Sequence, residues 1–294
     1  MTINDAIKEF LLEQASRGNS RKTVKDYRTK LMFFLNFTGD IDVNDITVSL
    51  CRRYHLSLCE RISNTVSVQT YVRSLRAFLK WLFVEEYIDY DICYKFKLPK
   101  ARKPTIIPLT NAEIHDIFNV IEGDTILHLR NQLIIALMLD CGLRLNEVVD
   151  IRLDKLFREE RCLVVTGKGD KQRAIAYGLH TESLLNRYLA LRNSPSNLLL
   201  IKVSGDEIGE PITENTIKDL FRRLKVRSGV SRLYPHLLRH TFATRYIENG
   251  GNIFSLQLLL GHTSLNMVKR YVHLANSKVR REFVNFSPLD RLDD

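Results

Sequence analysis

Residues 98–108, LPKARKPTIIP, constrain the fold most, because three prolines in eleven residues prevent a helix from running through them. Three basic residues lie between the first two prolines, and the segment is predicted to be an extended, solvent-facing linker. A chain of 294 residues has room for about two domains. We therefore expect domains at residues 1–98 and 109–294, joined by a linker at 99–108. A basic strap of this kind suits a protein that encircles a polyanion, and an ordinary surface loop fits the same residues equally well.

Apolar residues before the linker recur at helical spacing, which predicts a helix-only first domain. Helices are expected at residues 6–14, from Ser20 or Thr23 onward, at 47–58 and from Ser67 onward. The apolar side of the last of these helices consists of Tyr71, Leu75, Phe78, Leu79, Leu82 and Phe83. Its opposite side carries polar residues that we expect to be exposed, namely Gln69, Arg73, Arg76 and Lys80.

After the linker, helical patterns are interrupted by one short β segment. A cap at Thr110 or Asn111 begins the first helix, and residues 129–139 form a strongly apolar helix. Residues 162–166 and 173–177 are predicted to form a β-hairpin. Further helices are expected at 182–192, 214–226, 235–249, 254–260 and 265–273. The predicted fold class is therefore mainly α with a small β-sheet.

Lysine and arginine outnumber aspartate and glutamate by 44 to 34, which gives a net charge of +10. This balance suits a polyanionic partner, although basic proteins without one are common. The sequence contains no run of about 18 apolar residues, the length needed to span a membrane. Residues 1–5 do not have the basic start of a signal peptide. The five cysteines form no CxxC pair, and their odd number argues against a disulfide framework. We therefore expect a cytoplasmic protein with reduced thiols and no membrane partner.

Towards the carboxyl end, one stretch combines residues that could act on a phosphodiester. His236 and Arg239 are three residues apart, so one turn of helix places them on the same face. His262 adds a second imidazole, and Tyr271 follows it by nine residues. A neutral tyrosine, with a pKa of about 10, is a poor nucleophile. An arginine and two imidazoles around Tyr271 are what an attack on a phosphodiester would require.

Three further residues upstream could complete such a site. Arg144 follows a helix break at Cys141-Gly142 and precedes Glu147 by three residues, so an ion pair at the start of a new helix could orient its guanidinium. A guanidinium suits phosphate because its planar fork binds two oxygens at once and does not deprotonate. Lys168 lies in the turn of the predicted hairpin, flanked by glycines that allow close backbone approach to a ligand. Taken singly, an arginine near a helix start or a lysine in a turn is usually a solvated surface residue.

Together, the motifs GLRxxE, GKG, HxxRH and LLGH, with Tyr271 nine residues after the last, resemble the tyrosine recombinase (phage integrase) family. Lys168 follows Arg144 by 24 residues and His262 follows Arg239 by 23, a spacing similar to that of compact bacterial Xer recombinases. The resemblance covers nearly the whole chain. It implies a helical, DNA-binding core-binding domain, a basic linker and a mixed α/β catalytic domain. The expected activity is site-specific breaking and rejoining of DNA, which serves recombination or integration.

The resemblance also implies roles for single residues. Arg144 and Arg239 would bind the scissile phosphate and stabilise the pentacoordinate state. Tyr271 would attack in line and leave a 3′-phosphotyrosyl bond and a free 5′-hydroxyl. Lys168 would protonate the departing 5′-oxygen. Because the covalent bond stores the energy of the phosphodiester, neither metal nor ATP nor another cofactor is expected.

The remaining members of the motif set would act on protons and orientation. His236 would serve as general base towards the tyrosine and later as acid. His262 would donate a hydrogen bond to a non-bridging phosphate oxygen, and Glu147 would orient the site. The expected partner is double-stranded DNA with a specific core site, bound by a homotetramer or a paired heterotetramer. Apolar residues Val279 and Phe283 lie at helical spacing in the tail, which would contact a neighbouring subunit or pack as a terminal helix in the same one.

Family resemblance also suggests which side chains contact DNA. In the first domain the candidates are Thr23, Lys25, Gln69, Arg73 and Arg76. In the second, Asn215 occupies the start of a helix that contacts bases in the family, and asparagine can pair bidentately with adenine. Glu214, beside it, departs from the basic or polar residue common there in the family. Arg173, next to the hairpin turn, is expected to contact a phosphate. Each of these residues could equally touch only phosphate or water.

Several rival interpretations remain for this stretch. His236 and His240 have a zinc-like spacing, but Arg239 replaces the glutamate of an HExxH motif and would repel a cation. We expect His240 to be a packed, hydrogen-bonded core residue. The GKG turn is no Walker loop, which needs GxxxxGK followed by serine or threonine. Tyr234 and Tyr246 could compete as nucleophiles but fit packing positions better.

Two other functional classes use the same scaffold. One is a DNA-binding regulator with an inactive site, and the other is a relaxing enzyme similar to type IB topoisomerases. The presence of every expected catalytic residue type argues against the first. The biological role stays open between Xer-like dimer resolution and integration or resolution of a transposon.

Overall fold

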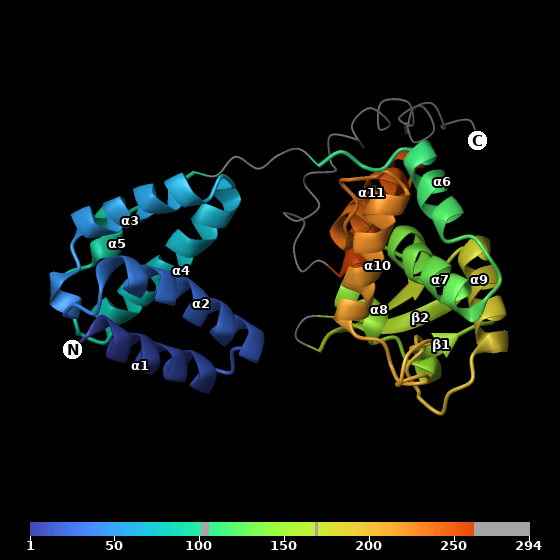
Figure 1. Ribbon diagram of the computed structural model, residues 1–294, viewed down its shortest axis with the longest axis horizontal. Coiled ribbons are helices and arrows are strands. Elements are labelled where there is room, and N and C mark those ends of the chain that lie inside the picture. The colour runs from blue at the N-terminus through green and yellow to red at the C-terminus, as the bar shows by residue number, and fades with distance from the viewer. Residues whose placement is uncertain (101–105, 168–169, 262–294) are drawn as a thin grey trace, which may run out of the picture. The chain divides into compact units, whose positions relative to one another are not determined.

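A computed structural model describes residues 1–100, 106–167 and 170–261 (Figure 1). The chain divides into two compact units, Met1–Thr105 and Ile106–Asp294. Three segments that the sequence singles out fall outside the described residues: part of the linker, Lys168 in the hairpin turn, and everything from His262 onward, which includes Tyr271 and the tail.

The first unit is helical, as predicted. Its elements are α1 (Ile3–Ser16), α2 (Arg21–Thr38), the 3-10 turn η1 (Val43–Asp45), α3 (Val48–Arg61), α4 (Thr65–Val84) and the short α5 (Ile92–Lys95). The side chains of Thr2, Ser20, Thr47 and Asn64 accept hydrogen bonds from the first turns of α1 to α4. Capping by these short polar residues explains where the helices begin.

The core of the first unit lies along α4, which contacts α1, α2, α3 and α5. The Phe10 ring meets Tyr27, Phe78 and Trp81 edge-on, with ring centroids 5.3 to 5.6 Å apart. Leu75 and Leu82 of α4 are buried in the same core. The apolar face predicted for this helix is therefore the one that packs.

The second unit combines helices with one small sheet, which confirms the predicted fold class. Its helices are α6 (Asn111–Val120), α7 (Ile126–Asp140), α8 (Leu145–Val149), η2 (Leu153–Lys155), α9 (Leu179–Leu191), α10 (Glu214–Arg227), α11 (Pro235–Glu248) and α12 (Ile253–Leu260). The strands β1 (Leu156–Phe157), β2 (Cys162–Thr166) and β3 (Gln172–Ala176) form an antiparallel sheet in the order β1-β2-β3. The hairpin β2–β3 was predicted, whereas β1 was not, because two residues are too short to show alternation.

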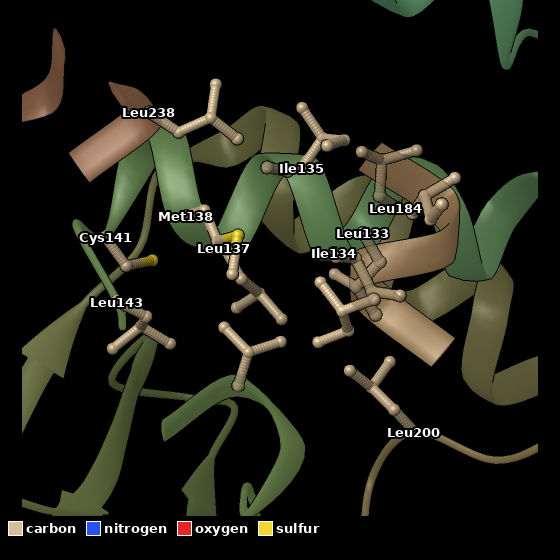
Figure 2. Close-up of a cluster of buried hydrophobic side chains, with 14 of the residues drawn as sticks. Leu133, Ile134, Ile135, Leu137, Met138, Cys141, Leu143, Leu184, Leu200 and Leu238 are labelled. Carbon is tan, nitrogen blue, oxygen red and sulfur yellow. The ribbon is translucent and has the colours of Figure 1, made fainter. Parts of the chain in front are cut away.

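Helix α7 forms the centre of the second unit's core. It contacts α9 and α11, and every residue from Leu129 to Met138 is buried. Figure 2 shows Leu133, Ile134, Leu137 and Met138 of α7 packed among side chains from other elements. A helix that is buried on every face, including its polar residues Arg130, Asn131 and Gln132, needs partners on every side. Packing against α9 and α11 therefore fixes the carboxyl end of α7 and the turn that follows it.

A sharp turn at Gly142 links α7 to α8. Gly142 has φ +62°, a conformation that residues with a Cβ rarely adopt. A Cβ there would lie 2.3 Å from the Phe242 ring. The turn thus needs glycine for both backbone and space, and it places Arg144 at the N-cap of α8.

The end of the predicted linker docks against α11 and the loop before it, through contacts that we call the linker anchor: Arg232, Glu113, His240, Thr241 and Arg245. Four consecutive carbonyls, of residues 106 to 109, accept hydrogen bonds from His240, Arg232, Arg232 again and Arg245. The Leu109 N–H donates to Thr241 Oγ1 at 3.0 Å. Arg232 also pairs with Glu113, with Nη2–Oε2 at 2.6 Å. Residues 106 to 109 are therefore fixed to the second unit, although the Ile107 side chain is 65% exposed.

Cys51, Cys93 and Cys141 are buried free thiols, and Cys59 and Cys162 are free thiols that solvent reaches. Burial raises the pKa of the Cys51 thiol to about 12. Within the described ranges, none of the helices has both the length and the apolar character to cross a bilayer.

Candidate active site

Glu147 is the centre of the site. It lies in the first turn of α8, its side chain is 1% exposed, and its Oε2 accepts the Arg144 backbone N–H at 2.8 Å. Its Oε1 accepts Arg144 Nη1 at 2.7 Å, which is the ion pair predicted from the three-residue spacing. The Arg144 side chain is 26% exposed. A buried carboxylate therefore orients a guanidinium that solvent can still reach.

Arg239 of α11 approaches the same carboxylate from another direction. Its Nη1 lies 3.9 Å from Glu147 Oε2 and donates to the Gly142 carbonyl at 2.5 Å. Its Nη2 donates to the Leu260 carbonyl at 2.6 Å. The side chain is only 8% exposed. The structure thus brings Arg144 and Arg239 together, although 95 residues separate them in the sequence.

Arg173 of β3, which was expected to contact a phosphate, completes the cluster through contacts within the protein. Its Nη1 and Nη2 donate to Glu147 Oε1 and Oε2 at 2.9 and 2.8 Å, and its Nε donates to the Leu259 carbonyl at 2.8 Å. The side chain is 12% exposed. A strand signal could have revealed this inward direction, because Arg173 shares the face of the buried Ile175 two residues along.

The ionisation of Glu147 follows from these contacts. Burial alone raises the pKa of a carboxyl group, but hydrogen bonds from Arg173 and the Arg144 backbone, together with the charge of Arg173, lower the pKa of Glu147 to about 2. The carboxylate is therefore charged at neutral pH. It compensates one of three guanidinium charges and leaves the cluster with an excess of positive charge.

Two glycines border positions that the motifs assign to catalysis. Gly167 follows the last residue of β2 and precedes Lys168, and Gly261 is the left-handed C-cap of α12 and precedes His262. Lys168, His262 and Tyr271 themselves lie outside the described residues. His236 is exposed in the first turn of α11, one turn before Arg239.

The DNA-contact candidates of the first unit divide into two groups. Arg73 and Lys25 are exposed, and Thr23 is half-buried with its hydroxyl against Ser20. Gln69 and Arg76, predicted to be exposed, are half-buried instead. They donate to the carbonyls of Pro99 and Cys93 at 2.8 and 3.1 Å, because the chain after α4 returns over that side of the helix.

In the second unit, Asn215 is exposed in the first turn of α10, after the N-cap Thr213. Glu214 beside it pairs with Lys218 at 3.0 Å, an ordinary contact between residues four apart on a helix. Asn215 also lines a polar cavity of about 600 Å³ together with Arg130 and Arg223. This cavity is separate in its lining residues from the Glu147 cluster.

The rival interpretations can be compared with the geometry. His240 Nε2 bonds to the Ile106 carbonyl at 2.9 Å, a structural role rather than a metal-binding one. Across the described residues, no group of three or more histidine, cysteine, aspartate or glutamate side chains is arranged to hold a metal ion. Tyr246 packs against Phe242, as expected. Tyr234 differs, because it is 38% exposed at the extended N-cap of α11.

The chain is similar to known proteins over most of its length. The chain matches the phage integrase family over residues 108–278 and the phage integrase N-terminal SAM-like domain over residues 7–86. Tyrosine recombinase XerC of Staphylococcus saprophyticus is 30% identical over 278 residues, which cover 92% of each chain. XerC of Staphylococcus aureus is 28% identical over 295 aligned residues, covering 97% of this chain and 96% of that one.

Solved structures show the same fold. The Tn1549 transposon integrase in complex with a circular intermediate DNA matches with a TM-score of 0.79 and 20% identity, over 96% of this chain and 99% of that chain. The XerH recombinase bound to a palindromic difH substrate matches with a TM-score of 0.72 and 22% identity, over 91% of this chain and 81% of that chain.

The chain belongs to the phage integrase family of tyrosine recombinases, enzymes that cleave and rejoin DNA. Within that family its similarity to the XerC proteins makes it Xer-like. The family resemblance drawn from the motifs is thereby confirmed.

Proposed function

We propose that this recombinase attacks DNA with Tyr271, forms a 3′-phosphotyrosyl bond and exchanges strands at a specific duplex site. The observation that carries the proposal is the convergence of three arginines on one buried carboxylate, Glu147. Three positive charges against one negative charge make a preorganised site for a phosphate. Arg144 is the most exposed of the three and is the guanidinium best placed to meet DNA.

In this mechanism, the positive cluster stabilises charge as it develops on the phosphate. Arg144 and Arg239 contact the non-bridging oxygens, and His262 donates a further hydrogen bond to one of them. Such preorganised donors usually supply the largest share of catalysis. The chemistry needs little else from the protein, since phosphoryl transfer depends mainly on positioning and electrostatics.

Proton movements involve two other groups. His236 takes the proton of the Tyr271 hydroxyl as it attacks and returns it when the strand is rejoined. Lys168 donates a proton to the departing 5′-oxygen, which would otherwise leave as a strongly basic alkoxide. The exposure of His236 at the start of α11, one turn from Arg239, is compatible with this role.

A suicide duplex, nicked beside the cleavage position, tests the nucleophile. Tyr271→Phe is expected to abolish the covalent protein–DNA adduct, because the ring without its hydroxyl cannot attack phosphorus. DNA binding by the same variant should persist and serves as the control. An adduct in the Phe variant would identify another nucleophile, and Tyr234→Phe and Tyr246→Phe are the matched comparisons. Relaxation of random plasmid without any specific site would favour a topoisomerase-like activity instead.

For DNA recognition, we propose that Arg73 and Lys25 contact phosphates and that Asn215 reads a base. All three are exposed, whereas Gln69 and Arg76 are engaged with backbone carbonyls. Phosphate contacts position a protein and base contacts specify the sequence. Selecting bound sequences from random duplex DNA, with wild type and Asn215→Ala side by side, measures whether this position specifies a base.

The active assembly is proposed to be a tetramer on two synapsed duplexes, either a homotetramer or a paired heterotetramer. Helix α12 presents Phe254 and Leu258, which are 60% and 75% exposed and lie four residues apart on one face. An apolar face of this kind suits the apolar tail of a neighbouring subunit. Val279, Phe283 and Phe286 supply apolar side chains at helical spacing in the sequence of that tail.

Removing residues beyond Ser277 separates assembly from binding. The truncated protein is expected to lose cooperative binding to paired half-sites while it still binds a single half-site. Gel-shift titrations on one-site and two-site duplexes measure both quantities. Phe254→Ser with Leu258→Ser should reproduce the loss in the full chain. An equal loss on both duplexes would argue against the tail as a subunit contact.

The biological role is proposed to be resolution of DNA dimers or movement of a transposon, in the cytoplasm. The similarity to XerC proteins supports the first, and the fold shared with the Tn1549 integrase is compatible with the second. Recovering the preferred duplex sequence and locating it in a genome would distinguish the two roles. A chromosomal site and a transposon end differ in copy number and in genomic location.

A further inference from the structure

The Arg173 side chain connects three elements of the second unit: its own strand β3, helix α8 and helix α12. Its guanidinium forms a fork-to-fork pair with Glu147 of α8. Its Nε holds the carbonyl of Leu259, in the last turn of α12. All three nitrogens of the side chain are thus engaged within the protein. A guanidinium is suited to this task because its five N–H groups lie in one rigid plane.

The same side chain touches the two glycines that precede proposed catalytic residues. A Cβ on Gly261 would lie 3.1 Å from Arg173 Cδ and Nη1, which is tighter than most Cβ contacts, so this position favours glycine. A Cβ on Gly167 would lie 3.4 Å from Arg173 Nη1. The backbone entering position 168 and the backbone entering position 262 therefore both rest against one planar group.

Arg239 supplies a second brace on the same turn. It donates to the carbonyl of Leu260, next to the Leu259 carbonyl that Arg173 holds, and it too approaches Glu147. Carbonyls at the end of a helix lack partners within it and carry partial negative charge, so cations stabilise them. Two guanidiniums and one carboxylate thus fix the end of α12 relative to α8.

We infer that Arg173 is a positioning residue that sets Gly167, Gly261 and the Glu147-bound guanidinium of Arg144 relative to one another, without touching DNA. This inference rests on the proposed function, which assigns catalysis to Arg144 and to the residues that follow the two glycines. A displacement of about 1 Å in a catalytic group can lower a rate by about 10²-fold. Lysine at position 173 would keep the charge but could not hold two carboxylate oxygens and a carbonyl in one plane.

The test compares Arg173→Lys and Arg173→Ala with wild type on the nicked suicide duplex. The single-turnover rate of adduct formation at saturating protein should fall by about 10²-fold in each variant. The dissociation constant for DNA and the slope of its logarithm against log salt concentration should stay at the wild-type values. Millimolar guanidinium should partly restore the rate of Arg173→Ala, because it can occupy the vacated position beside Glu147.

Arg192→Lys is the matched control. Arg192 also spends its guanidinium on backbone carbonyls, including those of Leu199 and Ser196, but it touches neither Glu147 nor the two glycines. Its variant should cleave at the wild-type rate once the rate is corrected for the folded fraction, measured by circular dichroism. This separates a general loss of structure from a loss of positioning.

Three outcomes would overturn the inference. A wild-type rate in Arg173→Lys would show that the three-way contact is not needed. Weaker binding with a salt slope reduced by about 0.9 would identify Arg173 as a phosphate ligand. A loss without any guanidinium rescue, matched by an equal loss in Arg192→Lys, would reduce its role to stability. If wild type itself forms no adduct, the proposed function fails first, and that result is distinguishable from all three.

Discussion

The Glu147 cluster and the linker anchor use the same chemical parts for different ends. Each pairs a glutamate with an arginine and adds backbone carbonyls as further acceptors. In the anchor, Arg232 and Glu113 are 37% and 25% exposed, and one positive charge meets one negative charge. In the cluster, a carboxylate that is 1% exposed meets three guanidiniums, of which only Arg144 is more than 12% exposed.

Stoichiometry and burial, rather than residue type, separate a structural contact from a binding site. The Arg232–Glu113 pair of the anchor is neutral, and Arg245 donates to a backbone carbonyl. The cluster keeps an excess of positive charge around a buried carboxylate, and electrostatic interactions are stronger where side chains are buried. The pKa of Glu113 is lowered to about 2, mainly by its hydrogen bond from Arg232, and the pKa of Glu147 reaches the same value. A depressed carboxyl pKa alone would therefore not have told the two regions apart.

Removing each carboxylate should separate the regions most strongly. Glu147→Ala leaves buried guanidiniums without their counter-charge, and we expect a loss of about 3–5 kcal/mol in the free energy of unfolding. Glu113→Ala, at a partly exposed pair, should lose about 1 kcal/mol or less. Urea titrations measure both losses. Adduct formation per folded molecule should fall about 10²-fold only in Glu147→Ala. Equal losses in the two variants would remove the distinction between the regions.

A smaller loss of unfolding free energy is expected when the uncharged Thr241 of the linker anchor is changed. Thr241 is fully buried, and its hydroxyl accepts the Leu109 N–H and donates to the Leu237 carbonyl. Thr241→Val would leave that N–H unpaired, at a cost of about 1–3 kcal/mol in unfolding free energy. Thr241→Ser keeps the hydroxyl and should retain most of the stability. The cleavage rate per folded molecule should not change, and a large drop would mean that the anchor takes part in positioning the site.

Mild acid should give the smallest loss of unfolding free energy, and it compares the ionisation of Glu147 with that of Glu113. Both carboxylates have folded-state pKa values of about 2 against an ordinary value of 4.5. Each therefore contributes stability above pH 4.5 that is lost as the pH falls towards 2. One pH unit below 4.5, the loss at Glu147 is about 1 kcal/mol. Because the two carboxyls share the same pKa shift, Glu147→Gln and Glu113→Gln should flatten the acid limb of a urea midpoint against pH to a similar extent. A clear difference between the two variants would contradict the equal shifts.

Local spacing predicted the parts of the molecule that depend on local contacts. Arg144 and Glu147 are three residues apart at a helix start, so their pairing could be read from the sequence. The hairpin, the helices of the first unit and the apolar face of α4 follow from periodicity and caps in the same way. The domain roles and the catalytic residues as a set remain predictions for the experiments above.

Tertiary partners were beyond the reach of such patterns. Arg173 meets Glu147 and Leu259, which lie 26 and 86 residues away, and no spacing rule connects them. Arg76 lies on the expected side of α4, but that side is covered by the Cys93 carbonyl in α5, 17 residues later. In both cases the sequence indicates the direction of a side chain, whereas its neighbour is decided by how the chain returns.

The linker anchor also defines where the second unit can be cut away from the first. The match to the phage integrase family begins at residue 108 and α6 begins at Asn111. A fragment starting at Asn111 would lack the carbonyls that engage Arg232, His240 and Arg245, together with the N–H that engages Thr241. A fragment starting at Ile106 or earlier retains them. Dissection by cloning or proteolysis should therefore place its boundary before Ile106, several residues ahead of the first helix.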